Sequence, residues 1–500
     1  MNTEVSNKSE VSNQSEVPNP HDASNPSGES DRHTVSIPFL HAVRFWLKLG
    51  CISFGGPAGQ IALMHRELVE ERRWISEQRF LHALNYCMVL PGPEAQQLAT
   101  SLGWLMHRTW GGLIAGALFV LPSLVLLIAL SWVYMALGDQ PLVAGLLYGI
   151  KPAVLAIVLQ AAHRLGIRTL RTPLHWALAL AGLIALSLSL PFPIVIVGAA
   201  LVGWVFARQW APATSKPSIQ HGARAAPHAV SSTAPADKTA TPPRYLIDDH
   251  SPTPAHAQPS RMRLLRVVGV GLALWALAMV LTLQIDSAQG TLMAMGEFFT
   301  KAALVTFGGA YAVLPYVVQG AVEAQGWLTP EQMIDGLALG ESTPGPLIMV
   351  VAFVGFVGGW TQEVFGSTAL LAGGIAGACV ATVFTFLPSF VFILAGGPFV
   401  EATRDRLAFT APLAAISASV VGVIVHLAIY FAGHVLWRDP ALQVGARDAW
   451  DRNLLAFYAT GLDPWALALT LAAALMLMAA RLNVLWVLAA SGLAGLALSI

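Results

Sequence analysis

Two glycine- and proline-rich motifs each occur twice in the sequence, and they are the features best suited to chemistry. Phe54-Gly55-Gly56-Pro57 precedes Pro91-Gly92-Pro93, and Phe307-Gly308-Gly309 precedes Pro344-Gly345-Pro346. The copies lie at a constant offset (345 − 92 = 253), which a lysine, a glutamate and a tryptophan around them also obey. A fixed offset over several residue types indicates an internal duplication, and duplicated apolar chains are typical of transporters.

These motifs predict broken helices and a site for an anion. A break inside a membrane leaves backbone N–H and C=O groups without partners, so it persists only where protein buries it or where it lines an aqueous cavity. The helix that restarts after the break presents free N–H groups and a partial positive charge. Glycine also lets the backbone approach a ligand without a Cβ in the way. Two such breaks facing each other at mid-membrane predict an oxyanion site.

The predicted binding residues share a position at or next to a break. They are Ser53, Gly55, Gly56, Pro57, Pro91, Gly92, Pro93, Glu94, Gln97, Thr306, Gly308, Gly309, Ser342, Thr343, Pro344, Gly345 and Pro346. The three cysteines have neither a disulfide pattern nor a metal-ligand spacing, and the sequence contains no nucleotide-binding loop. We therefore predict no metal, no cofactor and no catalytic residue.

Six charged residues are candidates for attracting the substrate or coupling its transport: Lys48, Lys301, Arg72, Arg73, Lys151 and Glu341. Ionisable residues are costly inside a membrane, so the duplicated lysine pair is a functional candidate, although each lysine can instead reach the interface. The arginines either gather anions at the cytoplasmic mouth or only set the topology. Lys151 has no counterpart in the second copy. Glu341 either carries a coupling proton or pairs with a basic side chain.

Composition places the chain in a membrane. Of 500 residues, 55% are hydrophobic and 11% are charged, with a mean hydropathy of +0.61, whereas soluble domains contain about 25% charged residues. The uncharged segment Gly112–Leu137 exceeds the ~20 residues needed to cross a bilayer. The sequence predicts an all-α polytopic protein with about 13 transmembrane segments if every apolar segment spans, and fewer if the motif segments re-enter. The formal net charge is +0 and gives no reason to expect a nucleic-acid partner.

Composition also divides the chain. We expect a disordered N-terminal tail over residues 1–36, a first repeat over 37–210, and a disordered Pro-, Ala- and Ser-rich linker over 211–263. An unpaired apolar span over 264–286 then precedes a second repeat over 287–500.

The distribution of Arg and Lys predicts how the two repeats are oriented. Basic residues collect on the cytoplasmic side, which places the N-terminus and the linker inside the cell. Residues 38–56 and 80–104 must then each dip into the membrane and return, or form a helical hairpin, so that the basic loop 65–79 stays cytoplasmic. The matching loop 310–332 has no Lys or Arg. We expect the unpaired span to invert the second repeat and leave the C-terminus periplasmic.

The motif sequences FGGPAGQIALMHRELVEERRW, LPGPEAQQLA, FTKAALVTFGG and GLALGESTPGP resemble the chromate ion transporter family in its long, two-domain form. The resemblance covers residues 38–500 except the linker. It implies a multi-pass protein of the bacterial inner membrane, an antiporter that exports chromate with energy from the proton-motive force and so confers chromate resistance. The residues of this sequence that match the motifs of the family are those of the glycine and proline motifs together with Arg72, Trp74, Glu94 and Trp327. Sulfate, a similar tetrahedral dianion, would compete, and a homodimer is a further partnership that the sequence allows.

Two alternatives remain open from the sequence. A carrier of sulfate or another oxyanion working in the opposite direction would share every motif. A membrane-embedded enzyme would need a nucleophile–base pair or a metal constellation, and its substrate would be chemically changed.

Overall fold

The computed structural model describes residues 37–138, 140–206, 245–248, 258, 260–286, 290–307, 309–402, 410–437 and 461–499. The predicted tail, most of the predicted linker and Gly308 lie outside these residues.

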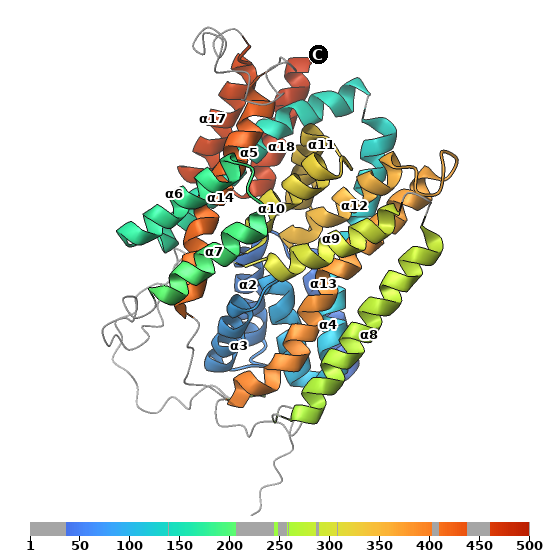
Figure 1. The fold of residues 1–500 in the computed structure, drawn as a ribbon, viewed down its shortest axis with the longest axis vertical. Coiled ribbons are helices and arrows are strands. Elements are labelled where there is room, and N and C mark those ends of the chain that lie inside the picture. The colour runs from blue at the N-terminus through green and yellow to red at the C-terminus, as the bar shows by residue number, and fades with distance from the viewer. Residues whose placement is uncertain are drawn as a thin grey trace, which may run out of the picture. The chain divides into compact units, whose positions relative to one another are not determined.

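Every named element of the described residues is a helix (Figure 1). The first repeat contains α1 (Phe39–Ile52), α2 (Gly56–His65), the π-helical turn η1 (Arg66–Glu71), α3 (Glu77–Val89), α4 (Glu94–Leu137), α5 (Pro141–Thr169), α6 (Pro173–Ser187) and α7 (Phe192–Val205). The second repeat contains α9 (Thr291–Val305), α10 (Ala310–Val317), the π-helical turn η3 (Val318–Ala324), α11 (Pro330–Ser342), η4 (Leu347–Met349), α12 (Val350–Thr361), α13 (Leu370–Ala402), α14 (Thr410–Leu436), α17 (Pro464–Met478) and α18 (Val484–Ser499). Helix α8 (Arg261–Ile285) lies between the repeats in sequence.

The duplication is visible in where the helices begin and end. α1 and α9 end 253 residues apart, and α3 and α11 share both boundaries at this offset. Their N-caps match too: Ser76 accepts a hydrogen bond from the third residue of α3, and Thr329 forms a capping box with Gln332 at the start of α11. Equivalent sequence signals therefore start and stop equivalent helices.

The first repeat opens with two helical hairpins. Trp74, just after η1, packs against Phe45 at the middle of α1, with ring centroids 5.1 Å apart. α4 breaks at His107 and Arg108, whose backbone is not helical, and His107 Nε2 lies 2.8 Å from the carbonyl oxygen of Ile37. Both hairpins, α1 with α2–η1 and α3 with the first part of α4, thus have their bases at the same end.

The second repeat opens in the same way. Trp327, just after η3, packs against Phe298 of α9 at 5.5 Å between ring centroids. Thr361, the last residue of α12, donates a hydrogen bond to the carbonyl oxygen of Trp327 at 2.8 Å. α9 with α10–η3, and α11 with η4–α12, therefore form a second pair of hairpins. The main apolar core surrounds this pair together with α5 and α14, and a separate cluster fills the first pair.

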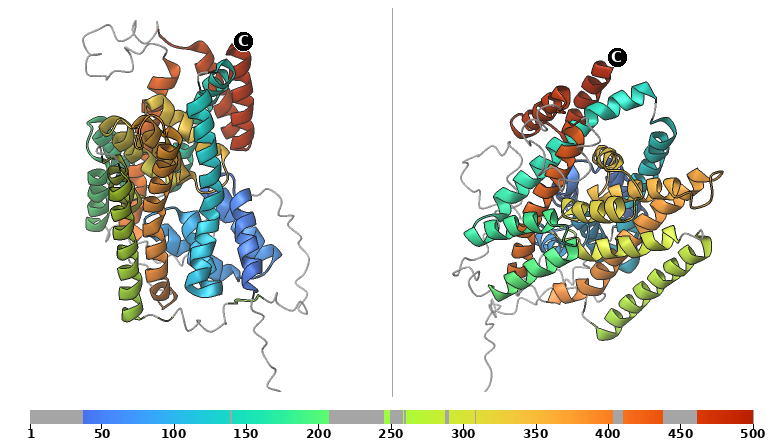
Figure 2. Two further views of the ribbon diagram at one scale, coloured as in Figure 1. Left: turned by 90° about the vertical axis from the view of Figure 1, so that its right-hand side faces the viewer. Right: turned by 45° about the horizontal axis from the view of Figure 1, so that its top comes forward.

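Long helices connect the bases of the two pairs. α13 begins soon after the base of the second pair of hairpins. Near the other end of α13, Gly397 lies against Trp104, which is at the base of the first pair of hairpins. The guanidinium of Arg263, at the start of α8, stacks over the same Trp104 ring at 5.6 Å. Figure 2 shows α8 and α13 running alongside one another, and both pack closely in the structure.

Five helices are long and apolar enough to cross a membrane: α4, α5, α8, α13 and α14. Five further apolar helices of the described residues are shorter: α6, α7, Leu347–Thr361, α17 and α18. The structure therefore describes fewer helices of full spanning length than the 13 crossings expected if every apolar segment spanned.

The short helices pack across the repeats. α6 and α7 pack on α14 of the second repeat, whereas α17 and α18 pack on α5 of the first. Glycines permit the close approach: Gly422 of α14 faces the backbone of Ala179 in α6, and Gly149 of α5 faces the backbone of Ser491 in α18. Each repeat thus completes its packing with helices of the other.

Two parts of the segment 211–263, which the sequence predicts to be a linker, are among the described residues. Residues 245–248 lie along the loop at 73–76, where the N–H of Leu246 donates to Arg73 O at 3.1 Å and that of Ile247 to Trp74 O at 3.0 Å. Arg261 begins α8, three residues before the expected start. Tyr245, Leu246 and Ile247 are apolar residues within a polar stretch, which explains why this part attaches to the protein.

Candidate anion site at the hairpin tips

The four hairpin tips are the two motifs and their copies. α1 ends at Ile52, and α2 begins at Gly56 after Gly55, whose φ is 91°. α3 ends at Val89, and α4 begins at Glu94 after Gly92, whose φ is 125°. A positive φ strains any residue with a Cβ, so these turns require glycine.

The second repeat forms its tips in the same way. α9 ends at Val305 and α10 begins at Ala310 after Gly309, whose φ is 102°. α11 ends at Ser342 and the next helix begins at Leu347 after Gly345, whose φ is 103°.

The tips of one repeat bind the tips of the other. The N–H of Gly345 donates to the carbonyl oxygen of Ser53 at 2.8 Å, and the N–H of Gly92 donates to the carbonyl oxygen of Thr306, also at 2.8 Å. Exchanging the repeats converts one hydrogen bond into the other, since Ser53 corresponds to Thr306 and Gly92 to Gly345. Reciprocal contacts of this kind are what a two-fold relation between two bodies produces.

A serine in a long helix of the opposite repeat covers each Pro-Gly-Pro tip. Ser389 of α13 occupies the space into which a Cβ added to Gly92 would project. A Cβ added to Gly345 would lie 2.8 Å from the Cβ of Ser123 in α4. Ser123 is at the middle of the second part of α4 (109–137), roughly 20 Å from either end at 1.5 Å per residue. The tips therefore meet deep within the helical layer.

Four helix N-termini converge on this region, because each hairpin's second helix starts at its tip. They belong to α2, α4, α10 and Leu347–Thr361, and none of these described N-termini has a side-chain cap. The first turn of a helix has N–H groups without intrahelical partners. The outer helices α3 and α11, by contrast, are capped by Ser76 and Thr329. The N–H groups left for another partner thus point to where the tips meet.

Three glutamines of the first repeat, all fully buried, line the tips: Gln60, Gln96 and Gln97. Nε2 of Gln60 donates to the carbonyl oxygens of Ser53 and Gly345, and Nε2 of Gln97 donates to Pro91 O at 2.7 Å. The amide oxygens of all three have no hydrogen-bond partner within the described residues, nor does the hydroxyl of Ser123. An unpaired buried polar atom costs about 1–3 kcal/mol, so these atoms favour a polar ligand or water at the tips.

The predicted hydroxyl ligands have a different role. Ser53 and Thr306 each donate to the carbonyl oxygen four residues earlier at 2.6 Å, and Thr343 donates to Gly340 O at 2.9 Å. Ser342 donates to Leu339 O at 2.9 Å. These hydroxyls satisfy carbonyls at helix ends, so their oxygen atoms, and not their protons, remain for further contacts. Glu94 occupies the first position of α4, at a tip.

The structure does not bring the lysine pair or the arginines to the tips. Lys48 pairs with Glu67 at 3.3 Å, and Lys301 forms an exposed pair with Glu297 one helical turn away. Arg72 also pairs with Glu67, at 3.2 Å, and its guanidinium lies 4.9 Å from the Phe45 ring centroid, near the hairpin base. The neighbouring Arg73 has a φ of 53°, and its carbonyl oxygen accepts a hydrogen bond from the N–H of Leu246.

The other two predicted charges lie in buried clusters that the sequence did not reveal. Lys151 of α5 pairs with Asp335 of α11 at 3.4 Å. Glu341, close to a tip, accepts a hydrogen bond from Tyr311 of α10. Asp335 is in a polar-looking segment near Glu331, so only the structure identifies it as buried. The signal that could have found Ser123 and Ser389 was the repeated Leu-Pro-Ser in the two long helices.

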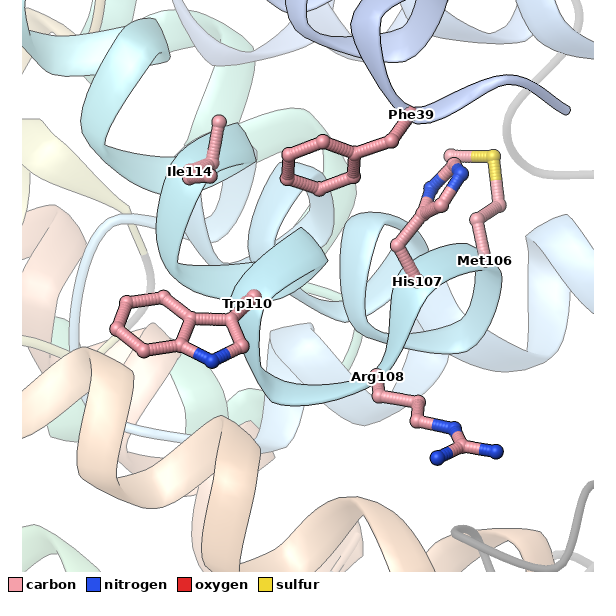
Figure 3. A pocket seen from close by; sticks show the side chains of 6 residues that line it. All are labelled: Phe39, Met106, His107, Arg108, Trp110 and Ile114. Carbon is pink, nitrogen blue, oxygen red and sulfur yellow. The ribbon is translucent and has the colours of Figure 1, made fainter.

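A pocket lies away from the tips. A cavity of about 640 Å³ lies at the break of α4 and is lined by Phe39, Met106, His107, Arg108, Trp110 and Ile114. Figure 3 shows Arg108 directed away from the ring of Phe39, which faces Ile114. The pocket is open and largely apolar, with one guanidinium, and it lies at the hairpin base. It does not include any of the four tips.

The fold, with five described helices long and apolar enough to cross a bilayer, is that of a helical membrane protein. The family described as Chromate transporter matches residues 40–204 and 293–496, one region in each repeat, and the chain belongs to this family. It is 32% identical to the chromate transport protein of Pseudomonas aeruginosa over 92% of both chains. It is 28% identical to that of Cupriavidus metallidurans over 78% of this chain and 82% of the other. It is 26% identical to a probable chromate transport protein of Synechococcus elongatus over 80% and 86% of the two chains. No solved structure matches the chain.

Proposed function

We propose that the protein is a secondary active transporter that exports chromate across the cytoplasmic membrane, is driven by the proton-motive force, and confers chromate resistance. The main support for an anion-binding site is the convergence of four uncapped helix N-termini at the tips. Each N-terminus is equivalent to about half a positive charge, so the four sum to roughly the two charges of a chromate dianion. The names of the similar proteins supply the substrate.

The tip segments themselves contain no lysine or arginine among the described residues, whereas Arg164 and Arg168 of α5 interact electrostatically with Glu341 and Glu94 beside them. Partial charges on backbone N–H groups can replace the hydration of an anion without holding it as a fixed cation would. Buried glutamines hold the tip carbonyls in place. Because backbone donors recognise charge and shape, sulfate is expected to compete with chromate.

Access to the tips from the two sides would alternate through an inverted repeat. Two observations support this proposal: the bases of the two hairpin pairs lie at opposite ends of α8 and α13, and the tips bind one another reciprocally. Rocking of one repeat against the other would then open the tips to one side at a time. The distribution of basic residues in the loops supports a cytoplasmic N-terminus and a periplasmic C-terminus.

The test is uptake of labelled chromate into everted membrane vesicles, energised or treated with an uncoupler, with and without excess sulfate. Export in the cell corresponds to uptake in this preparation. The proposal predicts energy-dependent accumulation that sulfate suppresses and the uncoupler abolishes. Accumulation equal to that of vesicles without the protein would overturn the chromate assignment, and uptake that survives the uncoupler would overturn the energy source.

A further inference from the structure

Helix α11 carries two buried carboxylates, each hydrogen-bonded by a tyrosine from another helix. Asp335 is 2% exposed and accepts from the hydroxyl of Tyr134 in α4 at 3.0 Å. Glu341 is 6% exposed and accepts from the hydroxyl of Tyr311 in α10. The two acids are six residues, or about 9 Å, apart along the helix. Glu341 is the nearer to the Pro-Gly-Pro tip at which α11 ends.

Asp335 also forms an ion pair that joins the two repeats. Its Oδ2 lies 3.4 Å from Nζ of Lys151 in α5, while its Oδ1 has no hydrogen-bond partner in the described part of the chain. The side chain of Asp335 is 3% exposed and that of Lys151 is 26% exposed. Buried charges of this kind are rare in membrane segments, and where they occur they commonly mark ion or proton paths.

The surroundings of α11 leave Lys151 as the cation paired with Asp335. α12, α18 and η4 pack against α11 and carry no titratable side chain. The titratable groups on its other neighbours are Tyr148, which donates to Asp463, and His163, Arg164 and Arg168 on α5, His426, Tyr430 and His434 on α14, Glu323 on η3, and Glu94, His107 and Arg108 at the far end of α4 from Tyr134. Glu331 lies on α11 itself, in its first turn.

The corresponding hairpin of the first repeat has a different chemistry. At the positions equivalent to Asp335 and Glu341 it has His82 and Met88, and its acid, Glu94, lies instead at the start of α4, where the second repeat has Leu347. The scaffold is thus duplicated, while the two acids of α11 have no counterpart in α3. This asymmetry is expected if one repeat mainly shapes the anion site and the other handles a cation.

We propose that Asp335 is the group that takes up and releases the coupling proton, with Lys151 as its counter-ion. This inference rests on the proposed proton-driven function. While ionised, Asp335 holds α11 to α5 through Lys151. A proton arriving from the more acidic side converts the carboxylate to the neutral acid and ends the ion pair, which frees α11 and its tip to move relative to the first repeat. Release of the same proton to the other side restores the pair, so no further reactant is needed.

The experiment uses purified protein in liposomes with two readouts: chromate accumulation driven by a pH gradient, and chromate–chromate exchange without a gradient. Asp335→Asn is expected to lose gradient-driven accumulation while still exchanging chromate, and its exchange should no longer vary with pH as that of the wild type does. Glu297→Gln, which changes an exposed acid of α9 in the same repeat, is the matched control and should retain both activities.

Because Asp335→Asn leaves Lys151 without its carboxylate, the double variant Lys151→Met/Asp335→Asn keeps the test decisive if the single variant folds poorly. The double variant should fold, exchange chromate and remain uncoupled. Gradient-driven accumulation by either variant at the wild-type level would overturn the role of Asp335, because a purely structural ion pair can be replaced in this way. If the wild type exchanges chromate but shows no gradient-driven accumulation, the proposed energy source itself fails.

Discussion

Replacement of Gly92 by alanine should disable the protein through the geometry of one hairpin tip. Gly92 has a φ of 125°, which residues with a side chain rarely adopt. Its added Cβ would lie 2.5 Å from Nε2 of Gln97 and closer still to Oγ of Ser389. Both neighbours are buried and packed, so the tip must shift away from Thr306, whose carbonyl oxygen it now binds.

The size of the effect follows from the strained backbone at Gly92 and from the steric overlap of the added Cβ. A residue held in a sparsely populated backbone region costs about 1–3 kcal/mol, and overpacking of a filled interior costs about another 1–3 kcal/mol. A combined cost of at least about 2 kcal/mol lowers the population of the native tip roughly 30-fold. Gly55→Ala should have a smaller effect, because Gly55 has a φ of 91° but its Cβ would find no atom closer than 4.0 Å.

The assay is the initial rate of chromate uptake into everted vesicles, normalised to the amount of monodisperse protein extracted from the membrane. Gly198→Ala is the matched control, because no atom lies within 4 Å of its added Cβ and its φ is not positive. We expect Gly198→Ala to transport like the wild type, Gly55→Ala to be slower and Gly92→Ala to be slowest. Equal rates for Gly92→Ala and Gly198→Ala would refute the reasoning.

Further predictions concern charges and packing. Lys301→Met should leave uptake unchanged, because an exposed pair one turn apart contributes about 0.5 kcal/mol or less; a large loss would show a role that the structure does not explain. Lys48→Met should lower thermal stability in detergent more than Lys301→Met does, because it removes one of two cations from Glu67, whose side chain is 6% exposed. Gly149→Val should lower the melting temperature by forcing α5 away from the backbone of Ser491, and an unchanged melting temperature would contradict this close packing.

The sequence predicted much of the tip geometry because the motifs act locally. Glycine with positive φ and proline after it break a helix whatever surrounds them, so the helix ends at Ile52 and Val89 followed from the residues themselves. The constant offset then transferred these boundaries to the second repeat. Gly308 and the tail fall outside the described residues, and the predictions made for them stay predictions.

The partners of the charged residues could not be predicted in this way. Lys48 lies four residues before the end of α1, close in sequence to a tip, but its ammonium group pairs with Glu67 of η1. The pairing of Lys151 with Asp335 joins residues of different repeats, and nothing in the local sequence encodes it. Contacts of this kind depend on how helices are arranged, which a one-dimensional pattern does not specify.

The most direct test of the central claim is the position of the bound anion. Crystals of the protein soaked in chromate would give an anomalous difference peak for chromium, which identifies the element as well as the place. The account predicts this peak among the four tips, within hydrogen-bonding distance of the first-turn N–H groups of α2, α4, α10 and Leu347–Thr361. A peak beside Arg108 in the pocket at the break of α4, with none at the tips, would contradict it.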